Sequence, residues 1–427
     1  MTSSPFNPTP PPGGRILPKM TGSAVIRCLA VSLALGSAAR AHAQDVVMAG
    51  PQEQLVTPAT RAQDQRTNQS QPDGPPESPF IVGPVILHPH LSSRYLHTTG
   101  LLVQQGLQVT TDITTLSPGL LMDFGKDWTV DYTPTWTYYS TRTKRDTLDH
   151  ALNIRGATTY EDWAFEFSES YNKSAPTLIE TAQQTDQVSW ATLLSATYNY
   201  GPKLSLQTIA SLNELYSDTF PDSRDWASMN WVNVKITPQV ETALGFGLGF
   251  TDVVGGADLK HQQYLGRVNW NPADKLKFSI QGGMDLRHSE SSTIGDVRNP
   301  ILQATLDYQL LETTKLTLAE ARTVVNSYFR DEVTSGSQWS INLQQRLLGR
   351  LFLTTGYSHR NTTYSSVTTT NFVGRSDRSQ AFSARLTTQL LRRLTLAVIY
   401  QNSRNSSNIS GFGFSSTQFG VEVGCKY

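Results

Sequence analysis

The chain has 427 residues, 35 basic and 35 acidic side chains, a formal net charge of zero and only 16% charged residues. A typical soluble domain is nearer to about 25% charged. Zero net charge gives no bulk attraction for nucleic acid or another polyanion. After the N-terminal region there is no apolar run of about eighteen residues, which excludes a helical membrane span there.

The N-terminal region has the pattern of an export signal. Arg27 precedes the apolar run Cys28–Leu35, and small residues follow as far as Ala43. A positive charge, a short apolar core and an Ala-His-Ala end predict a Sec signal peptide over residues 1–43. The leader before Met20 is Pro-rich and long for such a signal, so Met20 is a candidate for the true start.

Residues 44–80 are rich in Gln, Pro, Thr, Asp and Ser and almost lack aromatic side chains. Such a composition cannot bury a core, so we expect a disordered periplasmic segment before a folded domain at residues 81–427. A flexible linker is the main interpretation, and a plug inside the domain is the alternative.

Strict alternation of apolar and polar residues fills the rest of the chain. In Trp128–Tyr138 one face carries aromatic and apolar side chains and the other carries Thr and Asp. This period of two predicts strands. Eleven tilted residues rise about 28 Å, which suits the lipid-facing band of a transmembrane barrel. The pattern therefore predicts a barrel with lipid outside and water inside, and a secreted all-β protein remains the alternative.

Tight turns recur about every 35 to 43 residues, which indicates a repeated hairpin. They fall at 125–127, 161–162, 201–202, 238–239, 272–274, 312–314, 349–350 and 392–393. With a first strand at Val85–Leu96, they predict an all-β, antiparallel, up-and-down barrel of 16–18 strands, and 18 is preferred because bacterial barrels are even-numbered. Leu316–Tyr328 is the least regular strand, which indicates a bulge or an error of register.

Longer polar loops are expected at the opposite, outer end of the hairpins. The longest candidates are 96–113, 173–186 and 364–378. None is long enough to fold into a pore, so we expect any constriction to come from inward side chains or from the N-terminal segment.

Aromatic residues cluster beside the short turns, which predicts a belt at the periplasmic membrane interface. Its members are Phe124, Trp128, Tyr160, Trp163, Tyr198, Tyr200, Trp270 and Tyr308.

The last strand is amphipathic and ends in an aromatic residue. Phe419, Val421, Val423 and Tyr427 share one face. This arrangement resembles the C-terminal assembly signal of Gram-negative outer-membrane proteins. With the signal peptide, the belt and the hairpin repeat, the chain resembles the porin-like outer-membrane β-barrels from about Val85 to Tyr427. The resemblance implies outer-membrane lipids and the barrel-assembly machinery as partners.

Sorting strand residues by face places fifteen charges in the lumen. The cations are Arg155, Lys235, Arg267, Lys277, Arg287, Arg346, Arg360, Arg385 and Lys426, and the anions are Asp131, Glu166, Glu241, Asp285, Asp307 and Glu422. An excess of cations favours anions, so weak anion preference is the sharper hypothesis. The simpler one is that these charges solvate the lumen and pair across it.

The chain shows no pattern of an enzyme. It has no Gly-x-Ser-x-Gly elbow, no phosphate-binding loop and no clustered cysteines, so we expect no catalytic residues and no cofactor. His88 and His90 share a strand face, but a lone histidine pair is weak support for a metal, and we expect none.

The predicted function is passive diffusion of small hydrophilic solutes through an outer-membrane channel. The alternatives are a pore for polysaccharide export, with glycans as cargo, and a plugged barrel acting as a surface receptor or envelope scaffold.

Overall fold

The computed structural model describes residues 80–256, 258–289, 297–327, 332–366 and 374–427. The regular structure within these ranges is entirely β, and none of these residues forms a helix long and apolar enough to cross a membrane. The predicted signal peptide and the segment 44–79 lie outside the described residues. Phe80, the last residue of the predicted linker, already belongs to the first strand.

The described residues form twenty-one strands. They are β1 (Phe80–Val82), β2 (Val85–Gln104), β3 (Leu107–Phe124), β4 (Trp128–Tyr139), β5 (Thr147–Tyr160), β6 (Trp163–Ser174), β7 (Thr177–Leu178), β8 (Gln183–Gln184), β9 (Gln187–Tyr200), β10 (Leu204–Ser217), β11 (Ser223–Thr237), β12 (Val240–Val253), β13 (Leu259–Ala273), β14 (Leu276–Ser289), β15 (Val297–Leu311), β16 (Thr314–Asn326), β17 (Glu332–Leu347), β18 (Leu351–Ser366), β19 (Ser376–Leu391), β20 (Leu394–Ser407) and β21 (Phe414–Lys426).

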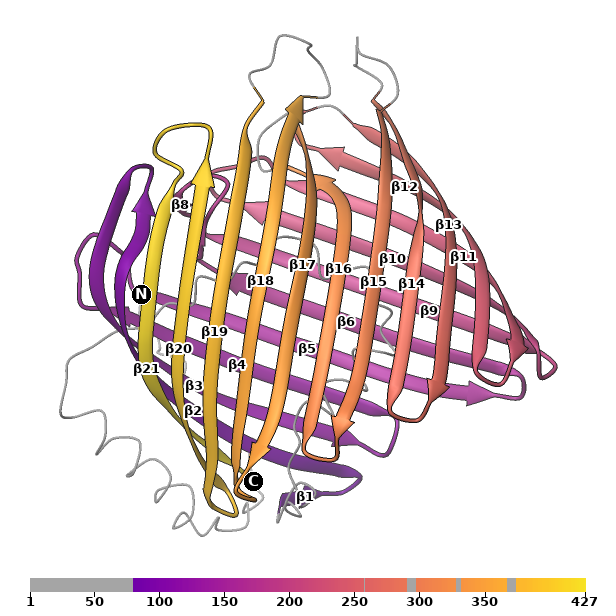
Figure 1. Ribbon diagram of the computed structural model, residues 1–427, viewed down its shortest axis with the longest axis horizontal. Coiled ribbons are helices and arrows are strands. Elements are labelled where there is room, and N and C mark those ends of the chain that lie inside the picture. The colour runs from indigo at the N-terminus through magenta and orange to yellow at the C-terminus, as the bar shows by residue number, and fades with distance from the viewer. Residues whose placement is uncertain (1–79, 257, 290–296, 328–331, 367–373) are drawn as a thin grey trace, which may run out of the picture. The chain divides into compact units, whose positions relative to one another are not determined.

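Eighteen of these strands form a closed antiparallel ring (Figure 1). Each pairs with the next along the chain, β6 pairs with β9, and β21 returns to pair with β2. The short β1 only extends the start of β2, and β7 and β8 pair with each other in a loop. Closure leaves no open edge, as a sheet in hydrocarbon requires. The preferred count of eighteen is confirmed.

Short turns join the strands at the end of the barrel where β2 begins and β21 ends, as expected. The connection between β2 and β3 at the outer end differs from the predicted polar loop. Residues 96–113 do not form a loop, because β2 and β3 continue as a paired ladder to a turn at Gln105 and Gly106. Gly106 has a φ of 76°, which the turn requires and which glycine adopts at low cost.

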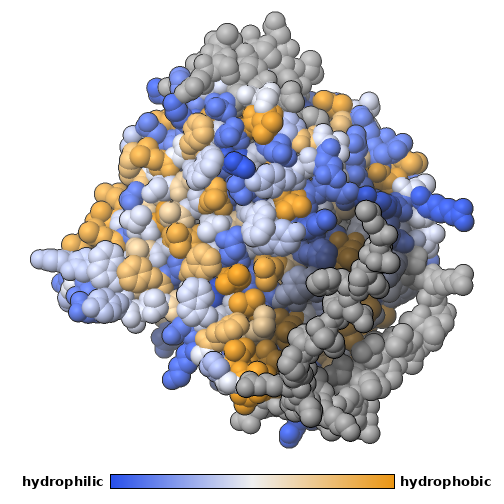
Figure 2. All heavy atoms as spheres, turned by 180° about the vertical axis from the view of Figure 1, so that it is seen from behind, coloured by the Kyte–Doolittle hydropathy of each residue, from blue (hydrophilic) through white to orange (hydrophobic). Residues whose placement is uncertain are grey.

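The exposed fractions of the side chains separate two faces of the ring. On β4, Trp128, Tyr132 and Tyr138 are 43%, 39% and 41% exposed, whereas Thr137 on the other face is 4% exposed. Hydrophobic side chains cover much of the wall seen in Figure 2. The outward face is therefore the apolar one, in accord with the inverted pattern of a transmembrane barrel.

Two aromatic belts ring the outward face. In the predicted belt, Phe124, Trp128, Tyr160, Trp163, Tyr200, Trp270 and Tyr308 are exposed at the turn ends of their strands, and Tyr198 is half-buried against Trp163. The sequence pattern missed a second belt near the outer ends, which includes Tyr138, Trp190, Trp226 and Tyr264. The interval between the belts marks the part of the wall that faces hydrocarbon.

The irregular strand β16 contains no bulge, so that interpretation was wrong. Its register with β17 is continuous, but its pairing with β15 ends at Arg322, opposite Leu302, although β15 continues to Val297. Beyond that point Val324 packs against Leu259 of β13. The hydrophobic phase changes along β16 because its outer end leaves the wall and packs with other strands.

Candidate functional site

The candidate site is the inner face of the barrel together with its outer mouth. The charged residues proposed to line the pore all lie on the face opposite to the exposed aromatic side chains. Lys235, Lys277 and Arg346 are exposed, Asp131, Arg155, Glu166, Glu241, Asp307, Arg360 and Arg385 are half-buried, and Arg267, Asp285 and Arg287 are buried. The structure thus divides one sequence-defined set into groups that solvent reaches and groups that it does not.

Three charges meet at the seam where β2 and β21 close the ring. Arg94 lies directly opposite Glu422, and its Nε donates to Oε2 at 2.9 Å. Arg385 of β19 donates to both oxygens of the same carboxylate, at 2.5 and 3.3 Å. Two guanidinium groups on one carboxylate leave this part of the inner wall with a net positive charge.

A buried tryptophan lies on the inner face of β11. Trp231 is 3% exposed and packs with Ala243, Leu265 and Ile301. It fits because Gly245 of β12 has no Cβ, which would lie 2.6 Å from the ring. The Arg267 guanidinium lies 4.3 Å from the ring centroid and donates to Asn233 at 2.6 Å. Arg267 is therefore held against the wall by a cation–π contact.

Asp285 and Arg287 form a buried ion pair on β14. Their side chains are 1% and 7% exposed, with Nη2 and Oδ2 separated by 3.2 Å. Arg287 also donates to the carbonyl oxygen of Val324 at 2.8 Å, which ties the outer end of β16 to the inner wall. This ion pair therefore connects β14 to the outer end of β16.

An outer loop crosses the mouth of the barrel, which the sequence did not predict. Residues 175–186, here called the mouth strap, connect β6 to β9 and contain β7 and β8. Its buried side chains are Ala175, Thr177, Leu178, Thr181, Ala182 and Thr185. Ala182 packs with Leu102 of β2 and Phe414 of β21. Since those strands are not neighbours of β6 or β9 in the ring, the strap reaches across the opening.

Arg375, just before β19, holds the mouth strap from across the ring. It is 5% exposed, and its guanidinium donates to the carbonyl oxygens of Ile179 and Glu180, at 3.0 and 2.5 Å. Its Nε donates to Asp377 at 3.0 Å. The ring centroids of Phe412 and Tyr364 lie 3.6 and 4.6 Å from the guanidinium carbon. We call Arg375, Asp377, Tyr364 and Phe412 the strap latch.

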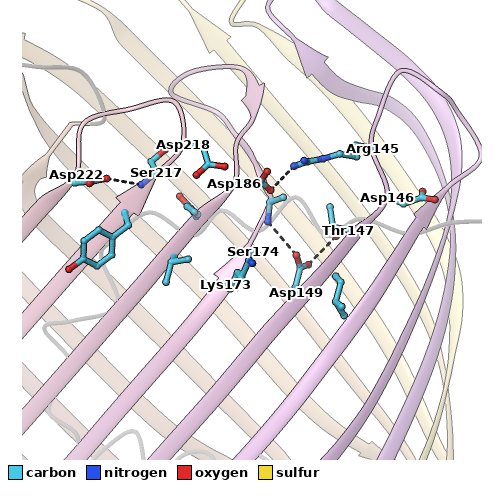
Figure 3. A pocket seen from close by; sticks show the side chains of 15 residues that line it. Arg145, Asp146, Thr147, Asp149, Lys173, Ser174, Asp186, Ser217, Asp218 and Asp222 are labelled. Carbon is cyan, nitrogen blue, oxygen red and sulfur yellow. Dashed lines mark hydrogen bonds and ion pairs between the residues drawn. The ribbon is translucent and has the colours of Figure 1, made fainter. Parts of the chain in front are cut away.

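A pocket of about 530 Å³ opens at the outer rim beside the strap (Figure 3). Five aspartates line it: Asp146, Asp149, Asp186, Asp218 and Asp222. Asp149 accepts from the backbone nitrogen of Ala175 at 3.3 Å, and Asp186 pairs with Arg145 at 2.5 Å. The carboxylates of Asp149 and Asp186 thus hold the ends of the outer loops in place. Across the described ranges, no group of His, Cys, Asp and Glu could hold a metal ion.

Lys144 is a buried cation in the loop between β4 and β5. It is 4% exposed, and its Nζ lies 5.4 Å from the centroid of the Tyr139 ring. Burial disfavours the charged form and lowers the pKa of Lys144 to about 7. The charge at this part of the mouth therefore changes near neutral pH.

His88 and His90 share the inner face of β2, as their spacing predicts, but they have different partners. His88 contacts Asp123 at 3.1 Å and the carbonyl oxygen of Tyr427 at 3.2 Å. His90 contacts the Thr133 hydroxyl at 3.1 Å. Both rings therefore connect neighbouring parts of the wall.

Sequence reasoning missed Arg94, Trp231 and Arg375. Arg94 lies within the first predicted strand and has the inward parity, so the face-sorting used elsewhere would have found it. Alternate glycines on β12, Gly245, Gly247 and Gly249, signal that large side chains lie across that strand. No local pattern identifies Arg375, because its partners in the mouth strap lie about 200 positions earlier in the chain.

The closed ring and its apolar outward face define a transmembrane β-barrel. Within this class, residues 264–427 match the family model described as Putative beta-barrel porin 2. Over these residues, which are less than half of the chain, the protein is similar to porin-like β-barrels.

Several solved structures are distantly similar. OccK2 (OpdF) of Pseudomonas aeruginosa is 13% identical with a TM-score of 0.46, covering 80% of this chain and 98% of that one. OccAB3 of Acinetobacter baumannii is 12% identical with a TM-score of 0.43, covering 80% and 99%. OccK11 (OpdR) of P. aeruginosa is 13% identical with a TM-score of 0.41, covering 80% and 95%. None of the curated proteins matches the chain.

Proposed function

We propose that the protein is a channel for passive diffusion of small hydrophilic solutes, with the mouth strap as its constriction. The observation that carries this proposal is a closed ring of eighteen strands with a polar and charged inner face. Barrels of about this size enclose an aqueous channel. The strap across the mouth favours small solutes over a polysaccharide chain, which needs a wide opening.

The test is a planar-bilayer recording of the purified protein, with migration on unheated and heated gels as the check of folding. A folded barrel should give steady conductance. A folded barrel that remains silent would reject the channel. Conductance that appears only after deletion of residues 44–79 would support the plugged receptor or scaffold instead.

Weak anion preference belongs to the same proposal. The seam carries Arg94 and Arg385 on the single carboxylate of Glu422. At the turn end, Lys235 lies opposite Glu241 in the register and largely offsets its charge. The surplus of positive charge at the seam therefore favours anions over cations, and we expect this preference to be small. The reversal potential in a salt gradient measures it, and cation preference would reject it.

We also propose that the C-terminal strand is recognised during membrane assembly. Phe419 and Val421 are 55% and 41% exposed on the outward face of β21, so both are accessible to a partner before lipid covers them. Replacing Phe419 with Ser should lower the yield of folded barrel in cells. Unchanged yield would count against this role.

A further inference from the structure

Polar side chains interrupt the lipid-facing surface on four consecutive strands, β6, β9, β10 and β11. The outward direction is marked by Phe165, Leu194, Leu206 and Val232, which are 40%, 53%, 46% and 46% exposed. Alternation puts five polar residues on this same face, here called the polar patch: Glu169, Thr192, Thr208, Ser228 and Asn230.

Hydrogen bonds within the polar patch satisfy only part of its polar groups. Thr192 Oγ1 donates to Glu169 Oε2 at 2.6 Å, and Thr208 Oγ1 donates to Asn230 Oδ1 at 2.9 Å. Asn230 Nδ2 has one long bond, 3.4 Å, to Ser228. A carboxylate and an amide with remaining capacity are unfavourable against hydrocarbon, where no water replaces the missing partner.

The patch lies between the two aromatic belts. Glu169 is six residues after Trp163 at the turn end of β6, and Asn230 is seven residues before the turn end of β11 at Thr237. The two side chains are therefore at nearly the same depth in the membrane. Long Lys and Arg side chains can extend their charged ends to the membrane interface, but the shorter Glu169 and Asn230 side chains reach it less easily.

The arrangement of the patch is nearly symmetric about the line between β9 and β10. These two strands pair with each other, and β6 and β11 flank them on either side. A twofold axis along the membrane normal at this line would place β6 of one copy opposite β11 of the other. Glu169, an acceptor, would then face Asn230, a donor, twice in one contact. Ala210, exposed on β10, allows close approach at the axis.

We propose that a second copy of this chain covers the polar patch, forming a homodimer in the membrane through β6, β9, β10 and β11. The partner is chosen by complementarity, since each copy supplies both the carboxylate and the amide that the other requires. This proposal is independent of whether the barrel conducts.

The test uses the full mature protein extracted from outer membranes and measures its mass in detergent by light scattering over a dilution series. The wild type should be a dimer, and Glu169→Leu and Asn230→Leu should each raise the dissociation constant about tenfold or more. The matched control is Glu320→Leu. Glu320 is also outward-facing, on β16 opposite Trp339, and lies outside the patch, so its replacement should leave the dimer intact.

A wild type that is monomeric at every concentration would overturn the proposal, as would a trimer. So would equal dissociation by Glu320→Leu, or a monomer that retains a different protein or a bound lipid at this face. If the leucine variants fail to reach the heat-modifiable barrel form, Ala210→Trp replaces them. It blocks close approach without removing a polar group, and it should give a folded monomer; a folded dimer would reject the interface.

Discussion

Replacing Arg375 with Ala should release the mouth strap while the barrel remains folded. The change removes two charge-assisted bonds to strap carbonyls, two ring contacts and the partner of Asp377, which is 2% exposed. Removing one partner of a buried ion pair costs about 3–5 kcal/mol. Asp377 belongs to β19, so part of this cost falls on the wall, and we assign about 3 kcal/mol to strap docking, or roughly a hundredfold in the undocked population.

Hydrogen exchange of the strap amides measures this effect directly. Within the strap, the amide of Ala182 donates to Leu178 at 2.7 Å and that of Thr185 donates to Pro176 at 3.1 Å, so both should exchange slowly in the wild type. Both should exchange about a hundredfold faster in the variant. The single-channel conductance should rise, because the constriction becomes mobile.

Arg378→Ala is the matched control, because Arg378 is exposed on the opposite face of β19. It should change neither exchange nor conductance. The double variant Arg375→Ala with Asp377→Ala should recover part of the loss, since no buried carboxylate is left without a partner. If the two strap amides exchange at the wild-type rate in folded Arg375→Ala, the latch does not hold the strap and the reasoning fails.

Three further outcomes are expected. Burial lowers the pKa of Lys144 from its ordinary value of 10.5 to about 7 in the folded loop, so the open loop binds more protons between these values. Exchange protection of the loop should therefore increase as pH rises from 7 to 10.5. Lys144→Met should abolish this pH dependence, and a pH dependence that persists in the variant would show that Lys144 is not its cause. Gly420→Ala should lower the unfolding temperature of the barrel by several degrees, through about 1–3 kcal/mol of overpacking, because the new Cβ would lie 1.9 Å from the Tyr95 carbonyl oxygen; Gly266→Ala, which meets nothing within 4 Å, is the control, and equal unfolding temperatures would contradict the clash. Glu422→Gln should shift the reversal potential toward anions, because two guanidinium groups lose their counter-charge, and an unchanged reversal potential would exclude the seam from the ion path.

The fold could be predicted from the sequence because lipid imposes a regular pattern on every strand. In Trp128–Tyr138 each second residue reports the solvent that it faces, and the turns then fix the number of strands. The prediction fails where that pattern no longer depends on lipid. Two segments interact with protein rather than with lipid: the paired ends of β2 and β3 at residues 96–113, and the outer end of β16. Their alternation therefore does not report which side faces lipid.

The inner face could be assigned, but the state of its charges could not. Parity places Arg267 and Lys277 on the same face, yet one is stacked on Trp231 and the other is exposed. The difference depends on Gly245 of β12, which leaves room for Trp231, and on Asn233 of β11, which accepts a hydrogen bond from Arg267. Burial of this kind comes from contacts between strands, which single-strand periodicity does not contain.

The mouth strap has a consequence for the order in which the molecule is built. Its partners Arg375 and Phe414 follow it in the chain by roughly 190 to 240 positions, so it cannot dock until the final strands are in place. Each nascent barrel must therefore pass through a stage in which the strap does not yet cross the mouth. A molecule truncated before the last hairpin should keep an undocked strap, however well its earlier strands have paired.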